Sequence, residues 1–376
     1  MKRIICLCVL IAMGCSISYV GVAAQGLSVD SSPDKRLNDH IKSFMVDRKI
    51  SGLALAIVKN DRVCFAHAYG FKNLDTKEPM TTESIFSMAS ISKTFTATAV
   101  MQLVEKGKIS LDDPLIKYLP YLTINDPRYK EITIKQMLTH TSGLTDTDSP
   151  KWYKPQYDDG AAERYVRSLT NEKLFGKPGE KYLYSNLAFD ILADVIAKVS
   201  GSTFEDYIKE SILNPLDMKE SDFLLKRIKP ELRTTPHFRS FTGENEVSPL
   251  YPYNRYHAPS ACLNANVLEM SHWAIANMNR GAFQGKRILS ESSYKLLFEP
   301  QAKVNDKISV GLSWFLFRYR DYQATSHSGG TLGFNSYIIM IPEKSLAVVV
   351  ASNCETNLLG DLTLDITDIM LGIEQK

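Results

Sequence analysis

This sequence of 376 residues has few cysteines, almost equal numbers of basic and acidic residues, and no long apolar run. Basic and acidic residues number 44 and 42, so there is no charged footprint for nucleic acid or for a membrane surface. The apolar run from Ile4 to Met13 is shorter than the roughly 20 residues that a membrane-spanning helix needs, and no later run reaches that length. These absences predict a globular chain without a transmembrane helix.

The sequence also lacks the short motifs of several enzyme classes. It contains no Gly-x-Ser-x-Gly elbow of an α/β-hydrolase, no His-Glu-x-x-His zinc motif and no Gly-x-x-x-x-Gly-Lys phosphate loop. No metal ion and no organic cofactor is therefore expected. Any catalytic site must be built from the side chains of the chain itself.

The first 24 residues have the pattern of a secretory signal peptide. Lys2 and Arg3 precede the apolar run, and small residues at 22–24 precede a predicted cleavage before Gln25. The protein is therefore expected to be exported, to the periplasm or outside the cell. The alternative is a lipid anchor on Cys15, because residues 12–15 resemble a lipoprotein cleavage motif except for alanine at its first position.

Three cysteines remain outside this segment, namely Cys64, Cys262 and Cys354. Three thiols cannot all pair within one chain, and a domain of this size does not depend on disulfides. We expect free, buried thiols. A single bridge is the alternative in an oxidising compartment.

Both ends of the chain predict strands next to a terminal helix. A helix beginning at Pro33 precedes a hairpin of residues 52–58 and 63–69. Near the other end, a second group of segments alternates as strands do, and an amphipathic helix closes the chain. The strands are expected over 310–318, 324–327, 336–341 and 346–352, and the helix is expected over 358–371.

Helical periodicity dominates the middle of the chain. Segments 132–138, 186–199 and 266–279 repeat apolar residues every three or four positions, and Asn266 with Glu269 predicts a capping box for the last of them. A loop rich in tyrosine and proline, 251–256, is expected either to line a substrate cleft or to cover an edge of the core.

This order of elements predicts an α+β fold of the α/β sandwich type. Its antiparallel sheet is built from both chain ends, 25–85 and 300–376, and is flanked by the terminal helices. A helical lobe, 86–299, is inserted between them within a single catalytic domain, 25–376. The active cleft is expected where the sheet meets the helical lobe.

Ser90 and Lys93 stand at the start of an apolar stretch in that lobe. Residues 91–104 are almost uncharged, which indicates a buried helix that ends near Gly107. On one helix face the Cβ atoms of Ser90 and Lys93 lie roughly 5 to 6 Å apart, so the lysine amine can accept the serine proton. The pattern Ser-x-x-Lys alone is weak evidence, because it occurs three times in the chain.

Two further patterns follow in order, and each occurs once: Tyr184-Ser185-Asn186 and His327-Ser328-Gly329. Together with the first Ser-x-x-Lys of the helical lobe and segments 111–115 and 138–144, they make the chain resemble the serine β-lactamases and penicillin-binding proteins. The similarity is to the branch of class C β-lactamases, D-aminopeptidases and esterases, and it implies a β-lactamase/transpeptidase-like fold. The related set has Ser-Asp-Asn as its second motif and Lys-Thr-Gly as its third. This chain has tyrosine in place of the serine of the second motif and histidine in place of the lysine of the third.

The resemblance implies three catalytic residues: Ser90 as the acylated nucleophile, with Lys93 and Tyr184 as the proton-transfer pair. To act as a base at neutral pH, a lysine must lose about 3 pKa units, roughly 4 kcal/mol, from its ordinary value near 10.4. A helix N-terminus supplies at most about 2 kcal/mol, so burial must supply most of the shift. Whether Lys93 or Tyr184 finally takes the proton stays open. His140 is interpreted as a structural loop residue.

The same resemblance implies the substrate contacts. Asn186 would bind a substrate amide, and His327 and Gly329 would lie on the strand that edges the cleft. Backbone N–H groups of Ser90 and Gly330 would form the oxyanion hole.

The substrate stays open among a β-lactam, a D-amino-acid peptide and a carboxylic ester, small molecules or peptides of possible cell-wall origin. A lysine in the third motif would hold a substrate carboxylate, whereas His327 carries a positive charge only when protonated. This difference favours an esterase or a D-amino-acid peptidase. The alternative function is a non-catalytic module that binds cell-wall fragments or β-lactams in the same cleft.

Overall fold

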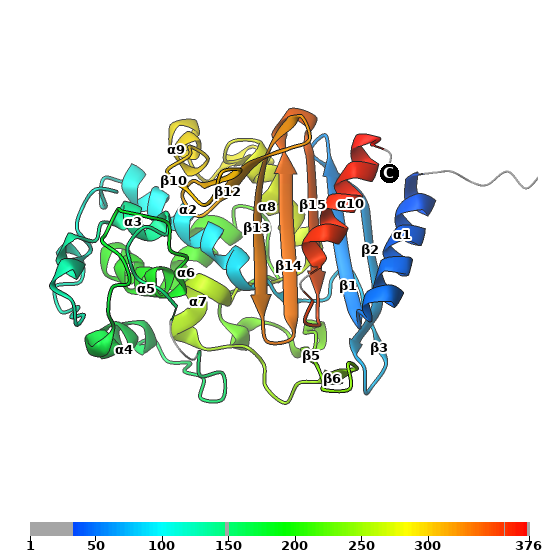
Figure 1. The fold of residues 1–376 in the computed structure, drawn as a ribbon, viewed down its shortest axis with the longest axis horizontal. Helices are drawn as coiled ribbons and strands as arrows, with labels where there is room; N and C mark the ends of the chain where they lie inside the picture. The colour runs from blue at the N-terminus through cyan, green and yellow to red at the C-terminus, as the bar shows by residue number, and fades with distance from the viewer. Residues whose placement is uncertain (1–32, 147–149, 357, 374–376) are drawn as a thin grey trace, which may run out of the picture.

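The computed structural model describes residues 33–146, 150–356 and 358–373, so the predicted signal peptide and Cys15 lie outside the described residues. Nine strands form one antiparallel sheet in the centre of the fold (Figure 1). They are β1 (Gly52–Lys59), β2 (Arg62–Asn73), β3 (Glu78–Pro79), β10 (Ala302–Lys303), β11 (Ile308–Val310), β12 (Phe315–Tyr319), β13 (Tyr322–Thr331), β14 (Phe334–Ile341) and β15 (Leu346–Ser352). Their order is β10-β11-β12-β13-β14-β15-β1-β2-β3, so the two chain ends meet in one sheet, as predicted.

The first and last long strands pair at the middle of this sheet. Strand β1 runs antiparallel to β15, from Leu53 opposite Ser352 to Lys59 opposite Leu346. Both strands are buried along almost their whole length, which explains their continuous apolar sequence. The predicted hairpin turn after β1 is confirmed, because Asn60 and the residue after it both have positive φ, as a type I′ turn requires.

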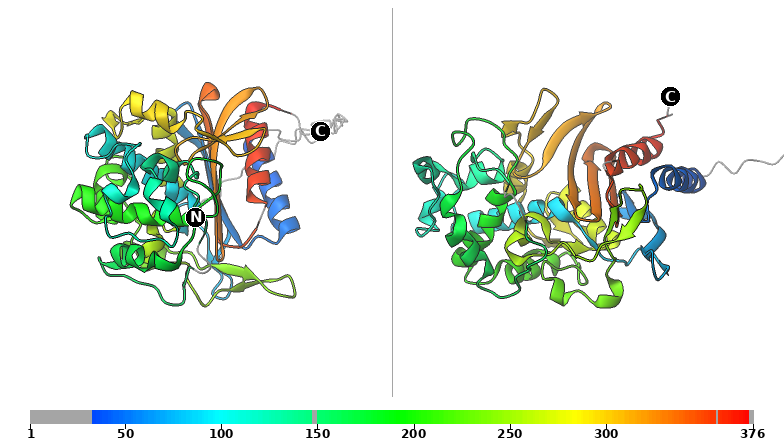
Figure 2. Two further views of the ribbon diagram at one scale, coloured as in Figure 1. Left: turned by 60° about the vertical axis from the view of Figure 1, so that its left-hand side comes forward. Right: turned by 60° about the horizontal axis from the view of Figure 1, so that its bottom comes forward.

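Helices cover both faces of the sheet. The terminal helices α1 (Pro33–Arg48) and α10 (Leu359–Leu371) lie side by side on one face (Figure 2). The other face packs on α8 (Val267–Met278), which contacts β1 and β15. Each apolar face of a sheet must be buried against another layer. For this second face the layer is α8, which comes from the segment inserted between the two halves of the sheet.

The helical lobe lies beside β13 (Figure 1) and surrounds the buried helix α2 (Ser92–Glu105), whose first twelve residues are all buried. The other helices of this part are α3 (Ile134–Leu138), α4 (Ala161–Ser168), α5 (Asn186–Ser200), α6 (Phe204–Ile208), α7 (Ala258–Ala261) and α9 (Glu291–Leu297). Helix α2 contacts α5, α6, α7 and α9. It is the centre of the lobe because it is apolar on all sides.

Two local predictions need correction. Residues 310–318 are not one strand, because the chain leaves the sheet after β11 and rejoins it at β12. There Gly311 passes so close to Leu297 that an added Cβ would lie 2.2 Å from the Leu297 carbonyl oxygen. The capping box at α8 is only half formed: Asn266 accepts a hydrogen bond from the Glu269 N–H, but the Glu269 carboxylate accepts hydrogen bonds from residues 220 and 221 instead.

The tyrosine-rich loop covers an edge of the core. Tyr253 and Tyr256 are 1% and 4% exposed. Between them Arg255 forms a buried ion pair with Glu205 of α6, in which Nε and Oε1 are 2.8 Å apart. This pair ties the loop to the helical lobe.

All three cysteines of the described chain are free. Cys262 and Cys354 are buried, as expected, whereas Cys64 is exposed on β2, near an edge of the sheet. The prediction of a buried thiol is therefore wrong for Cys64.

Replacing Arg255 by alanine is expected to lower the free energy of unfolding by about 3 to 5 kcal/mol, because Glu205 would remain as a buried carboxylate without its partner. Arg164→Ala is the matched control, because its ion pair with Asp158 is exposed and is worth about 1 kcal/mol or less. Urea unfolding measures both changes. Equal losses in the two variants would show that the buried pair does not anchor the loop.

Candidate active site

Ser90 and Lys93 lie in direct contact. Lys93 Nζ donates hydrogen bonds to Ser90 Oγ at 2.9 Å and to the Ser260 carbonyl at 2.8 Å, and the lysine is completely buried. The sequence predicted Ser90 to lie in the α-helix, but it lies in a 3₁₀ turn, Ala89–Ile91, that leads into α2. The tighter turn still places Ser90 and Lys93 on one side, because side chains three residues apart align in a 3₁₀ turn.

Strand β13 presses against this turn. Ala89 has a positive φ of 43°, a strained conformation for a residue with a side chain. A Cβ added to Gly329 would lie 2.3 Å from the Met88 carbonyl oxygen, so only glycine allows the strand to approach so closely. Ser336 on β14 donates a hydrogen bond to that same carbonyl at 2.8 Å. The sheet therefore fixes the turn that carries Ser90.

Burial gives Lys93 the properties of a base. Aromatic rings of Tyr184 and Phe189 lie 5.0 and 5.8 Å from Nζ. Burial lowers the pKa of Lys93 to about 7, against the opposing attraction of Asp190 and Asp146. A substantial share of Lys93 is therefore unprotonated at neutral pH.

Tyr184 and Asn186 stand at the N-terminus of α5. Ser185, between them, caps this helix by accepting a hydrogen bond from the Ala188 N–H at 2.9 Å. The Asn186 N–H donates to Asp146 Oδ1 at 2.8 Å. Burial raises the pKa of Tyr184, and a hydrogen bond with Ser90 opposes the rise. Tyr184 is therefore protonated at neutral pH.

His140 holds this segment in place, which agrees with its interpretation as a structural residue. Its Nδ1 accepts a hydrogen bond from the Ser185 N–H at 3.1 Å, and its ring stacks on Tyr184 at 4.4 Å. The His140 carbonyl also accepts a hydrogen bond from the Leu183 N–H. Burial holds the pKa of His140 well below its ordinary value, so the ring is neutral.

His327 lies on β13 but is only 1% exposed. Its Nδ1 donates a hydrogen bond to the Ser328 carbonyl at 2.7 Å, and the ring packs 5.3 Å from Phe315. Burial, aided by the nearby Lys93, lowers the pKa of His327 to about 3. The residue that replaces the lysine of the third motif is therefore neutral throughout the physiological range of pH.

A pocket of about 280 Å³ opens beside Ser90. Three predicted site residues line it: Ser90, Asn186 and Gly330. The full lining consists of Ser90, Asp146, Pro150, Trp152, Asn186, His257, Ser260, Ala261, Gly330, Thr331 and Leu332. Lys93 is hydrogen-bonded to Ser90, and Gly329 is the residue of β13 that packs against the Ser90 turn.

Several residues of this site were not predicted from the sequence, among them Asp146, Trp152, Asp190 and His257. His257 binds Asp190 through Nδ1 at 2.6 Å, and both side chains are buried. A signal existed for Asp190, because it is an acidic residue four positions after Asn186 in the mainly apolar first half of this helix. The loop residues Trp152 and His257 have no periodic pattern that could have identified them.

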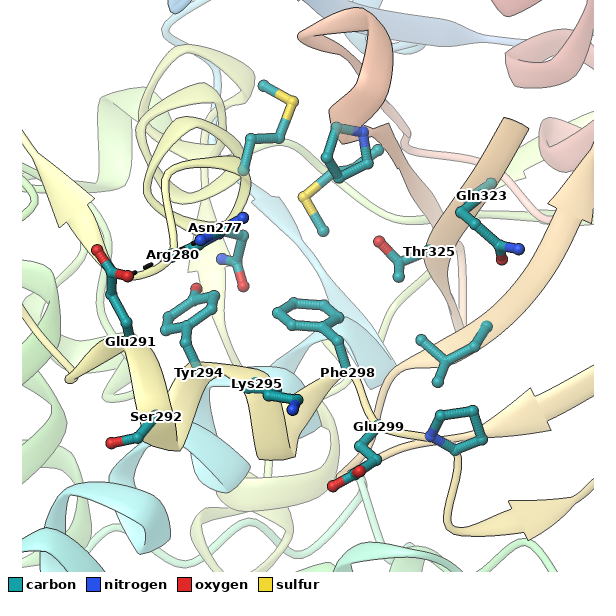
Figure 3. Close-up of a pocket in the computed structure, with 16 residues that line it drawn as sticks. Asn277, Arg280, Glu291, Ser292, Tyr294, Lys295, Phe298, Glu299, Gln323 and Thr325 are labelled. Atoms are coloured by element: carbon teal, nitrogen blue, oxygen red, sulfur yellow. Dashed lines mark ion pairs between the residues drawn. The ribbon is translucent and has the colours of Figure 1, made fainter. Parts of the chain in front are cut away.

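A larger cavity, of about 930 Å³, lies elsewhere, where α9 faces β12 to β14 (Figure 3). Apolar side chains such as Phe298 and Met340 line it, and Arg280 pairs with Glu291 at its rim. None of the predicted site residues belongs to its lining. Size alone therefore does not locate the chemistry of this fold.

Within the described ranges, no group of three or more histidine, cysteine or acidic side chains is arranged to hold a metal ion. In the same part of the chain, no helix is both long enough and apolar enough to cross a membrane.

The antiparallel sheet, the helical lobe and the buried Ser–Lys pair define the class of protein, that of the serine β-lactamases and penicillin-binding proteins. The family model described as Beta-lactamase matches residues 37–366. The chain belongs to this family.

Individual relatives are distant. The chain is 27% identical to Protein flp of Staphylococcus aureus (strain COL) over 318 residues, 83% of this chain but 61% of that protein, so it spans less than two thirds of that relative. It is 28% identical to penicillin-binding protein 4* of Bacillus subtilis (strain 168), over 85% of this chain and 72% of that protein. The octameric penicillin-binding protein homologue from Pyrococcus abyssi has a similar structure, with a TM-score of 0.81 and 26% identity over 90% of this chain and 78% of that chain.

The Gly329→Ala substitution is expected to slow acylation of Ser90 by on the order of 10²-fold, because the new Cβ would push the strand away from the Met88 carbonyl and shift the nucleophile. Ser328→Ala, an exposed position on the same strand, is the control and should react at the wild-type rate. The rate of labelling by a fluorophosphonate measures the effect, and thermal unfolding shows whether each variant is folded. Normal labelling of folded Gly329→Ala protein would contradict this role of the strand.

The rate at which Ser90 reacts with a fluorophosphonate is expected to rise with pH through about 7 and then to level off, because only unprotonated Lys93 can accept the Ser90 proton. Lys93→Arg should abolish the reaction, since a guanidinium does not lose its proton in this range. Labelling rates measured from pH 5 to 10 test the expectation. A rise centred near pH 10 would mean that Lys93 keeps its ordinary pKa and is protonated at neutral pH.

Proposed function

We propose that the protein is an exported serine hydrolase that forms an acyl-enzyme on Ser90 and then transfers the acyl group to water. The observation that carries the proposal is the 2.9 Å hydrogen bond between Ser90 Oγ and the buried Lys93 amine, whose pKa is lowered to about 7. Export is proposed from the pattern of residues 1–24, with the lipid anchor on Cys15 as its alternative.

Lys93 is the proposed general base, because the pKa of Tyr184 is raised while that of Lys93 is lowered. Ser90 Oγ attacks the substrate carbonyl carbon as its proton moves to Lys93 Nζ. The proton then passes to the leaving group, for which the protonated Tyr184 hydroxyl is the proposed relay. Backbone N–H groups of Ser90 and Gly330 are proposed to stabilise the oxyanion.

The charge of the pocket favours one group of substrates. Asp146 is an acidic residue in its lining, no lysine or arginine is among the lining residues, and His327 is neutral. A substrate carboxylate, such as that of a β-lactam, would find neither a lysine nor an arginine in the described lining. We propose that the substrate is an ester or amide, including D-amino-acid peptides, whose bound part is uncharged or carries an amine.

The similarity to penicillin-binding proteins supports a substrate related to the cell wall. A non-catalytic binding module on the same fold is the alternative. The contact between Ser90 and Lys93 argues against it, because a binding protein gains nothing from burying a lysine at this cost in desolvation.

Labelling with a fluorophosphonate, followed by peptide mass mapping, tests the enzymatic proposal. We expect one adduct, on Ser90, that is absent from the Ser90→Ala variant. Absence of any adduct from folded wild-type protein, or equal substrate turnover by Ser90→Ala, would favour the binding module.

A substrate panel tests the specificity. p-Nitrophenyl esters and D-alanyl amides with a free amine are expected to give kcat/KM values at least about tenfold above that of nitrocefin, because one unfavourable charge contact costs about 1.4 kcal/mol or more. Asp146→Asn should selectively lower kcat/KM for the amines, with a smaller effect on uncharged esters. Nitrocefin as the best substrate would overturn the assignment based on the pocket charge.

A further inference from the structure

A second buried hydrogen-bonded pair lies beside the Ser–Lys pair. His257, immediately before α7, binds Asp190 on α5 through Nδ1 and Oδ2 at 2.6 Å, and the two side chains are 4% and 0% exposed. The mechanism proposed above uses neither residue. A buried carboxylate is costly, so its place next to the site requires an explanation.

The hydrogen bonding of this pair is incomplete. Oδ1 of Asp190 and Nε2 of His257 are both buried, and neither has a hydrogen-bond partner among the residues that the structure describes. An ionised carboxylate can accept about four hydrogen bonds, but Asp190 accepts one, from His257. Such a carboxylate needs a positive charge close by, which either His257 or Lys93 can supply.

The pair is connected to Lys93 through α7. The Ser260 carbonyl on this helix accepts a hydrogen bond from Lys93 Nζ, and Ser260 Oγ donates one to the His257 carbonyl at 3.2 Å. Asp190 exerts the strongest attraction of any charged group on Lys93. His257 also lines the pocket together with Ser90. The charge on this pair therefore affects the pKa of Lys93.

Other titratable groups act on Lys93 from the elements around it: Asp146, Tyr184, Cys262, His140 and His327. Burial lowers the pKa values of the two histidines and raises those of the tyrosine and the cysteine, so these four are neutral near pH 7. Asp146 is exposed and screened by solvent. Uncharged rings of Trp152, Tyr165 and Tyr256 surround His257. The hydrogen-bonded pair of Asp190 and His257 is thus the remaining buried acid and base beside Lys93 among the described residues.

We propose that His257 and Asp190 are positioning residues that set the charge of Lys93: a proton on His257 neutralises Asp190 and leaves Lys93 free to be uncharged. The inference rests on the proposed function, in which Lys93 is the base. During acylation the Ser90 O–H bond breaks, an N–H bond forms on Lys93, and that proton later goes to the leaving group. The proton on His257 is not consumed.

Two substitutions and their combination test the proposal. His257→Asn keeps an N–H donor in place of Nδ1 but cannot be positively charged, so Asp190 becomes an uncompensated negative charge. The pH at which the fluorophosphonate labelling rate reaches half its plateau should then rise by about 1 to 2 units, the effect of one nearby buried charge. Adding Asp190→Asn removes that charge, so the double variant should return to within about 0.3 unit of the wild type.

His272→Asn on α8 is the matched control. This partly buried histidine also bonds through Nδ1, to the Leu216 carbonyl at 3.0 Å, and the midpoint of its variant should not move. If the pair has only a structural role, the variants should react more slowly or unfold at a lower temperature, and the second substitution should not restore the midpoint. An unmoved midpoint in His257→Asn, or no restoration in the double variant, would overturn the proposal.

Titration of Lys93 by ¹³C NMR distinguishes a failure of this proposal from a failure of the proposed function. If the wild type takes no label at Ser90, the proposed function fails, but the midpoint of the lysine titration can still be compared between the wild type and His257→Asn. An upward shift in His257→Asn that the double variant reverses supports charge setting. Equal midpoints in all three proteins contradict it.

Discussion

The burial of one lysine amine against one serine hydroxyl is the constraint on which the rest of the site depends. Lys93 is completely enclosed, with Ser90 Oγ and the Ser260 carbonyl as its hydrogen-bond partners and aromatic rings beside it. Burial disfavours its charged form, and this shift is larger than the attraction of the two nearby carboxylates. The helical lobe therefore keeps a substantial share of this amine unprotonated at neutral pH, at the cost of burying it.

The sheet supplies the other half of the arrangement. Because Gly329 has no side chain, β13 reaches the Met88 carbonyl and holds the turn that carries Ser90. The pairing of β1 with β15 joins the first and last strands of the chain, so this rigid wall depends on residues from both ends. Ser90 lies where this wall meets the helical lobe, and a pocket opens beside it there.

Much of this fold was predictable because its signals are local. The hairpin around Asn60, the terminal helices and strands β13 to β15 follow from periodicity and turn residues. Ser90, Asn186 and Gly330, which were named from the motifs and the family resemblance, line one pocket. The break between β11 and β12 was missed because it depends on a close approach to Leu297, which is a tertiary contact. The pair of Asp190 and His257 was missed for the same reason, since 67 positions separate the two residues in the sequence.

Burial lowers the pKa of Lys93 to about 7, so a substantial share of this amine is neutral at pH 7, and direct titration of the side chain tests this most simply. In protein labelled with ¹³C-lysine, the Cε signal of Lys93 is assigned by its absence from the Lys93→Arg variant. This signal is expected to titrate with a midpoint near pH 7, while the signals of exposed lysines titrate near 10. A midpoint near 10 for Lys93 as well would contradict the account.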